Sequence, residues 1–154
     1  MILKNSWRPY LIKEKVLVNK RLINWGDLDA LGITFYPRYY EWMDACGHAF
    51  FDAIGLNMWR LWEERNILFG LIETHAKYHR PGRYFDELTI HTYLCELKSK
   101  ALALRHDIYN QEGQIMVEGL ERRICLNTRG PKQFKAMDIP KDIYERLRAH
   151  LKET

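Results

Sequence analysis

The feature that most constrains the fold is a change of hydrophobic period near residue 37. From Pro37 to Ile54, large apolar side chains recur at three- and four-residue steps, the spacing of one face of an α-helix: Tyr39, Met43, Cys46, Phe50 and Ile54. Pro37 suits the first helical position because its missing N–H would have no intrahelical partner there, and Gly55 suits the helix end. The sequence therefore predicts one long, largely buried helix.

Patterns typical of β-strands lie on both sides of this helix. The predicted strands are 12–25, 68–79, 87–97, 101–110 and 114–127. Gly113 lies between the last two alternating runs and predicts a hairpin turn, so consecutive strands are expected to pair antiparallel. The stretch 57–66 is expected to be irregular, and a final helix is predicted to begin near Pro140, with Ile143, Leu147 and Leu151 on one face.

One apolar helix and one antiparallel sheet bury each other most simply when the sheet curls around the helix. The predicted fold class is therefore α+β, with a curled antiparallel five-stranded sheet around a long central helix, plus a C-terminal helix. Residues 1–154 are enough chain for one core and too few for two, so a single domain is expected. The open edges of such a sheet would be covered by dimerisation through an edge strand.

Composition and motif content exclude several classes of function. The formal net charge of +4 is too small to indicate nucleic-acid binding, although it suits an anionic small-molecule partner. No apolar run is long enough for a signal peptide or a membrane span, which predicts a soluble, cytoplasmic protein without a membrane partner. The three cysteines have wide spacings and show no disulfide or metal pattern, so they are expected to be reduced core residues.

Cofactor and metal chemistry have no sequence support either. No glycine pattern matches a phosphate-binding loop or a dinucleotide fingerprint, and neither Ser6 nor Ser99 lies in a serine-hydrolase elbow. His75 and His79 lie on a predicted strand, where four residues span about 13 Å, too far for one metal ion. We therefore expect no metal and no cofactor.

The segment GDLDALGITFYPRYYEWMDA, residues 26–45, with Gly55 and Leu56 after the helix, resembles the signature of the 4-hydroxybenzoyl-CoA thioesterase family. Members of that family have the hotdog fold, and the order of the predicted elements agrees with it from about residue 12 to residue 140. The resemblance implies a homo-oligomer, a dimer or a tetramer, that hydrolyses acyl-CoA thioesters with a carboxylate and without a metal.

The resemblance also assigns catalytic positions. Asp29 matches the family's catalytic aspartate, which must be ionised to act either as a nucleophile on the thioester or as a general base on water. The backbone amide at Tyr36, at the start of the helix, would polarise the thioester carbonyl, and Gly32 would permit the tight loop between them. Asp27 is expected to be a structural turn residue.

Substrate-binding positions are suggested by the resemblance for the nucleotide and by the residue types for the acyl group. Coenzyme A carries phosphates, and Lys98, Lys100 and Arg105 are the basic residues expected to meet its nucleotide. Trp59 and Asp44 are expected to contact the acyl group, which could be an aryl or a medium-chain group.

Two alternatives use the same fold. A thioesterase acting on acyl carrier protein would need an exposed basic docking surface, for which the sequence offers Arg122, Arg123, Lys132 and Lys135. A non-catalytic acyl-CoA-binding hotdog module would keep the fold and the basic residues without needing the carboxylate.

Overall fold

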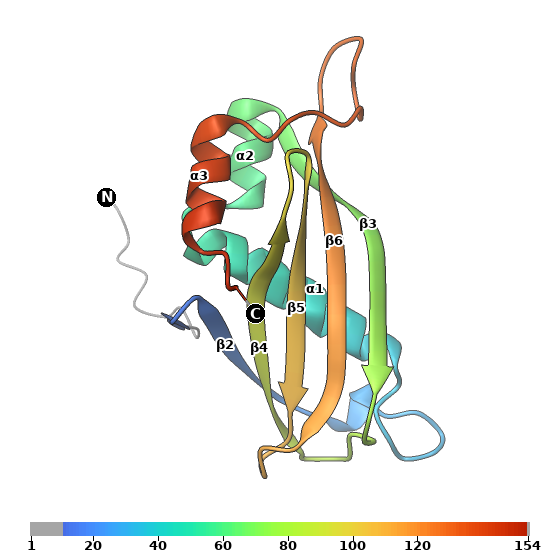
Figure 1. Ribbon diagram of the computed structural model, residues 1–154. Helices are drawn as coiled ribbons and strands as arrows, with labels where there is room; N and C mark the ends of the chain where they lie inside the picture. Colours follow the sequence, from blue (N-terminus) through green and yellow to red (C-terminus); the bar gives the residue numbers. More distant parts are fainter. Residues whose placement is uncertain (1–10, 154) are drawn as a thin grey trace, which may run out of the picture.

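The computed structural model describes residues 11–153 and has one helix lying across a curled antiparallel sheet (Figure 1). The helices are α1 (Pro37–Ala53), α2 (Met58–Arg65) and α3 (Lys141–Ala149), with a short 3-10 helix, η1 (Trp25–Asp27). The strands are β1 (Leu11–Lys13), β2 (Val16–Leu22), β3 (Ile67–Tyr78), β4 (Glu87–Leu97), β5 (Ala101–Tyr109) and β6 (Ile115–Asn127). Their order in the sheet is β1-β2-β4-β5-β6-β3, and every neighbouring pair is antiparallel.

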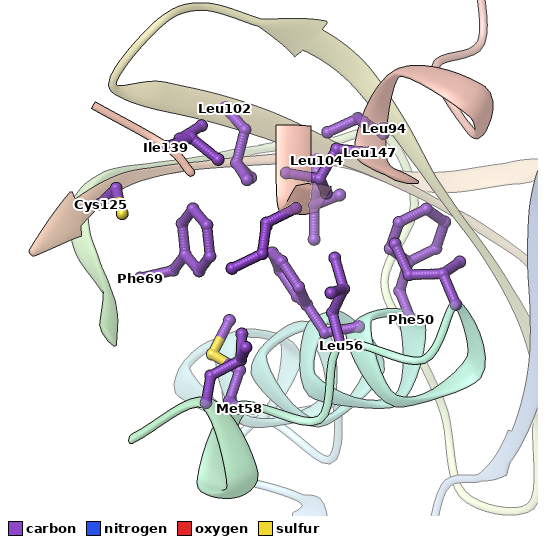
Figure 2. Packing of buried hydrophobic residues seen from close by; sticks show 14 of the residues in the cluster. Phe50, Leu56, Met58, Phe69, Leu94, Leu102, Leu104, Cys125, Ile139 and Leu147 are labelled. Carbon is purple, nitrogen blue, oxygen red and sulfur yellow. The ribbon is translucent and has the colours of Figure 1, made fainter. Parts of the chain in front are cut away.

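The predicted central helix is confirmed almost residue for residue. Pro37 is at the first position of α1, and Gly55 follows the helix with a positive φ of 83°. The buried side chains of α1 face the sheet in two clusters, one at each end of the helix. Figure 2 shows the cluster at the C-terminal end, where Phe50 and Leu56 lie in one cluster with Phe69 and Leu104 of the sheet.

Within residues 11–153 the sheet has six strands, one more than the predicted five. The chain turns at Glu14 and Lys15, which both have positive φ, and this turn separates β1 from β2 with Lys13 opposite Val16. Two-residue hairpin turns with positive φ usually contain Asn or Gly. The Glu-Lys pair lacks that signal, which is why 12–25 read as one strand.

Two helical predictions also needed correction. Residues 57–66, expected to be irregular, contain α2: the Asn57 side chain accepts the Arg60 N–H at 3.1 Å, and Asn66 ends the helix in the left-handed conformation. The C-terminal helix begins after Pro140 as predicted, but it ends at Ala149, and Leu151 forms a bridge with Leu94 of β4 instead.

The two edges of the sheet differ in length. β1 is three residues long, whereas β3 is twelve residues long and pairs only with β6 within residues 11–153. Leu71 and Ile72, near the middle of β3, are each more than half exposed. A long, unpaired and partly apolar edge strand is a surface that proteins ordinarily cover.

None of the helices in the described part of the chain is both long enough and apolar enough to cross a lipid bilayer.

Candidate active site

The two aspartates of the loop between β2 and α1 have different surroundings. The Asp27 side chain is buried, and its Oδ2 accepts the backbone N–H of Asn24 at 2.8 Å. Its other oxygen lies 3.8 Å from the guanidinium of Arg21 and 3.9 Å from that of Arg38. These contacts are those of a structural carboxylate that holds the base of the loop.

Asp29 lies on the tip of the same loop and is half-buried. Its Oδ1 accepts the N–H of Leu31 at 2.8 Å, and its backbone bonds to Ile33 and Gly32 close the turn. Gly32 has a φ of 74°, a conformation that favours glycine. Oδ2 of Asp29 has no hydrogen-bond partner among residues 11–153.

The start of α1 offers one backbone donor next to this loop. The N–H of Phe35 donates to the carbonyl of Asp27, and the N–H groups of Arg38 and Tyr39 donate to Phe35 and Tyr36. Pro37 has no N–H, and the N–H of Tyr36 has no acceptor in the described part of the chain. The Tyr36 amide is therefore a free donor at the positive end of a 17-residue helix.

A cleft of about 320 Å³ opens beside this helix end, with Thr34, Tyr36, Tyr39 and Tyr78 in its wall. Gly82 completes the wall: its carbonyl accepts the Thr34 N–H at 2.8 Å, and a Cβ there would lie 2.6 Å from the Tyr39 hydroxyl. Burial, together with the neighbouring Tyr40, raises the pKa of Tyr78 to about 12. The cleft therefore presents neutral tyrosine hydroxyls and aromatic faces. Asp29 lies on the adjoining part of the loop, outside the cleft wall.

The basic residues predicted to bind the nucleotide lie far from Asp29 in the same subunit. Lys98 and Lys100 are exposed in the turn between β4 and β5, 3.6 Å from Glu96 and 2.9 Å from Asp138 respectively. Figure 1 shows this turn at the opposite end of the sheet from the loop before α1. Since β4 runs the length between them, the separation is roughly 33 Å.

Arg105 does not join the two lysines. It lies in the middle of β5, where its guanidinium is 3.3 Å from Glu118 and 3.8 Å from Asp107. Both carboxylates near Arg105 have other partners as well, since Tyr93 donates to Asp107 at 3.1 Å and Glu118 lies 2.7 Å from His79.

The two residues predicted to contact the acyl group lie on different helices. Trp59 is on α2 and packs edge-to-face against Trp62, with ring centroids 5.0 Å apart. Asp44 is in the middle of α1, where it forms an ion pair with Arg123 at 3.0 Å and lies 3.5 Å from Nε2 of His48. One subunit therefore brings together Asp29, Gly32 and Tyr36, but not the remaining predicted residues.

The sequence reasoning missed a buried polar group between α1 and the sheet. His106, Glu121 and Arg123 are each at most 5% exposed, so Arg123 does not contribute to the exposed docking surface that the acyl-carrier-protein alternative would need. Alternation along β6 places Gly119, Glu121, Arg123 and Cys125 on one face. Cys125 was expected in the core, and Glu121 and Arg123 share its face of the strand. This alternation could therefore have placed both charged residues on the buried face of the sheet.

Comparison with known proteins identifies the family of this chain. Residues 23–147 match the family described as the thioesterase-like superfamily. The 4-hydroxybenzoyl-CoA thioesterase of Pseudomonas sp. (strain CBS-3) is 28% identical over 129 residues, which cover 80% of this chain and 91% of that protein.

Solved structures of thioesterases are also similar. A gentisyl-coenzyme A thioesterase is 32% identical with a TM-score of 0.72, covering 82% of this chain and 98% of that one. A mutant 4-hydroxybenzoyl-CoA thioesterase in complex with 4-hydroxybenzoyl-CoA is 28% identical with a TM-score of 0.78, covering 86% of this chain and 99% of that one.

The fold and the matches define the class of protein as a hotdog-fold thioester hydrolase, which confirms the predicted fold and enzyme class. Within this class, the chain belongs to the thioesterase-like superfamily. The resemblance of residues 26–45 to the 4-hydroxybenzoyl-CoA thioesterases is confirmed by the same findings.

Proposed function

We propose that this enzyme hydrolyses the thioester bond of an aryl-CoA, with Asp29 as the reacting carboxylate and the Tyr36 amide as the donor to the thioester oxygen. The observation that carries the proposal is that one short loop holds both a carboxylate oxygen and a backbone amide without a hydrogen-bond partner. Oδ2 of Asp29 and the N–H of Tyr36 both lack a partner in the described residues, while their neighbours are hydrogen-bonded. A carboxylate and an aligned amide are what thioester hydrolysis requires.

Two routes use these groups. In the first, Asp29 attacks the carbonyl carbon, the carbon–sulfur bond breaks, and water then hydrolyses the acyl-aspartate anhydride to the acid and free enzyme. In the second, Asp29 takes a proton from water as that water attacks, and the proton passes to the departing thiolate. In both routes negative charge develops on the carbonyl oxygen, where the helix amide stabilises it.

The separation of the lysines from Asp29 supports a homo-oligomeric active site. If two copies pair through their β3 edges about a twofold axis, the strands run antiparallel. The Lys98 and Lys100 end of one subunit then lies at the same end of the joint sheet as Asp29 of its partner. The nucleotide of coenzyme A would meet lysines from one subunit while its thioester meets Asp29 of the other.

The identity of the acyl group is supported by the relatives. The two structurally similar enzymes named above are described as acting on hydroxylated aryl thioesters, gentisyl-CoA and 4-hydroxybenzoyl-CoA. An aryl group therefore has more support than a medium-chain group. An acyl carrier protein as the thiol carrier has less support than coenzyme A, because two of the residues offered for its docking surface are not free: Arg123 is buried and Arg122 is paired with Glu73 and Glu96.

A thiol-release screen tests the proposal. The purified protein is assayed with benzoyl-CoA, hydroxybenzoyl-CoAs, and short-, medium- and long-chain acyl-CoAs, and with an acyl carrier protein loaded with the best acyl group. We expect kcat/KM for the best aryl-CoA to exceed that for every straight-chain substrate and for the carrier protein by at least about tenfold. If no acyl-CoA releases its thiol, the proposal is wrong and the non-catalytic acyl-CoA-binding function is favoured instead.

A further inference from the structure

A second cavity lies under α1, apart from the cleft at the helix start. It has a volume of about 220 Å³ and opens beside the edge strand β3. Tyr40, Met43 and Asp44 line it from α1, Thr74 lines it from β3, and His106 and Glu121 line it from β5 and β6. Its walls are largely apolar, whereas the sheet supplies two ionisable side chains.

These two side chains have unused hydrogen-bonding atoms. Glu121 is 3% exposed; its Oε2 accepts from Arg123 at 3.1 Å, but its Oε1 has no hydrogen-bond partner in the described residues. His106 is fully buried; its Nδ1 lies 2.8 Å from the Thr92 hydroxyl, and its Nε2 is likewise unpartnered. Nε2 and Oε1 are 3.3 Å apart, at ion-pair distance but without hydrogen-bond geometry.

The backbone makes room for this carboxylate. Gly47 lies in the interior of α1, where glycine is less favourable than alanine. A Cβ at Gly47 would collide with Oε1 of Glu121, and a Cβ at Gly119 would collide with the sulfur of Met43 in the cavity wall. Alanine at either glycine would therefore push on a group that lines the cavity.

The surroundings of Glu121 keep it negatively charged. Burial acts to raise the pKa of Glu121, but the adjacent His106 and Arg123 side chains hold it below its usual value. The terminal nitrogens of Arg123 are engaged, since they also donate to the Phe69 carbonyl at 3.1 Å and to Asp44 at 3.0 Å, whereas its Nε has no partner among the described residues. An ionised carboxylate only accepts hydrogen bonds, so the cavity suits a group that donates one and disfavours an anion.

We infer that Glu121 is a specificity-determining residue for the acyl group, accepting a hydrogen bond from a hydroxyl substituent on the aryl ring. His106 and Arg123 are positioning residues that orient the carboxylate. The inference rests on the proposed thioesterase function and deepens it by assigning the polar end of the substrate to this cavity. A buried charge cluster that serves only the fold would leave substrate preference independent of Glu121.

Matched substrates test the assignment. Benzoyl-CoA and its 2-, 3- and 4-hydroxy derivatives are compared by kcat/KM for the wild-type enzyme, Glu121→Gln and Glu118→Gln. Glu118 is the matched control because it lies on the same strand, on the outer face, where it contacts His79 at 2.7 Å. We expect the wild type to prefer one hydroxylated substrate by about tenfold or more, and Glu121→Gln to lose most of that preference while Glu118→Gln keeps it.

The outcomes separate the two proposals. Equal turnover of all four substrates by the wild type, or an unchanged preference in Glu121→Gln, would overturn the role of Glu121 and leave the thioesterase function standing. No thiol release from any acyl-CoA would overturn both. If the Gln variant does not fold, Glu121→Asp replaces it, since it keeps the charge beside Arg123 but withdraws the oxygens by one methylene; we expect it to lose the preference as well.

Discussion

Asp27 and Asp29 are two residues apart in one loop, yet their contacts suit different roles. Asp27 is buried, with both carboxylate oxygens close to donors or cations. Asp29 uses one oxygen to hold the turn and leaves the other without a partner in the described residues. At this scale, the arrangement of hydrogen bonds separates a structural carboxylate from a candidate catalytic one.

The first prediction concerns this pair. Asp29→Asn keeps the bond to the Leu31 N–H but provides neither a base nor an anionic nucleophile, so kcat should fall by about 10² to 10⁴-fold with little change in thermal stability. Asp27→Asn should instead lower the free energy of unfolding by about 1 kcal/mol. Steady-state kinetics and thermal melts of both variants check this. If Asp29→Asn, shown to be folded and not deamidated, kept kcat within about threefold, the assignment would be wrong.

The second prediction concerns Glu121 and acid. Its pKa is lower in the folded protein than its ordinary value of 4.5, because of His106 and Arg123, so the unfolded chain binds its proton more readily. The stabilisation is therefore complete above about pH 4.5 and is lost as the pH falls through the folded pKa. Between about pH 6 and pH 3, the Tm of the wild type should fall further than that of Glu121→Gln. Parallel Tm curves for the two proteins would contradict it.

At the scale of elements, the decisive feature is the length of β4. This strand separates the loop that carries Asp29 from the turn that carries Lys98 and Lys100 by its full length of eleven residues. The unpaired edge of β3 supplies the means by which a second copy could bring them together.

The third prediction tests the lysine turn. If Lys98 and Lys100 bind the nucleotide phosphates equally in the ground and transition states, their double change to alanine should raise KM for acyl-CoA by about five- to tenfold and leave kcat nearly unchanged. The salt dependence of KM should weaken as well. Lys132 and Lys135, exposed in the loop after β6, provide the control double variant. An unchanged KM would make the turn an ordinary solvated hairpin.

At the scale of the whole molecule, the proposed homo-oligomer depends on the edge strand β3, which pairs only with β6 in the described residues. The Asp29 loop, the cavity under α1 and the exposed Ile72 all lie on or near the side of the molecule that β3 borders. Pairing of two copies through β3 would therefore cover this partly apolar edge and also bring residues of a second copy to the candidate active site.

The fourth prediction tests that contact. Ile72→Lys places a charge on the unpaired edge, so the dissociation constant of the oligomer should rise at least about tenfold and activity should fall at low protein concentration. Sedimentation velocity and rate measurements over a dilution series check this, with Phe134→Lys, another exposed apolar position, as the control. A wild-type protein that is monomeric and fully active at nanomolar concentration would disprove it.

The sequence by itself determined the features that depend on nearby residues. The apolar spacing from Pro37 to Ile54, the glycine after it and the alternation in four later segments predicted α1, β3, β4, β5 and β6 closely. The motif at residues 26–45 indicated the family and the candidate catalytic loop. Where the local signal was weak, as at the Glu14–Lys15 turn and in α2, the prediction failed.

Only the tertiary structure decided which distant residues meet. The alternation along β6 could have placed Glu121 and Arg123 on the inner face, but nothing near them in the sequence shows that Gly47 of α1 lies against Glu121 or that His106 faces it. The distance between Asp29 and the lysine turn likewise follows from strand pairing. Periodicity records which face of its own element a side chain occupies, but the partner across that face is set by packing between segments far apart in the chain.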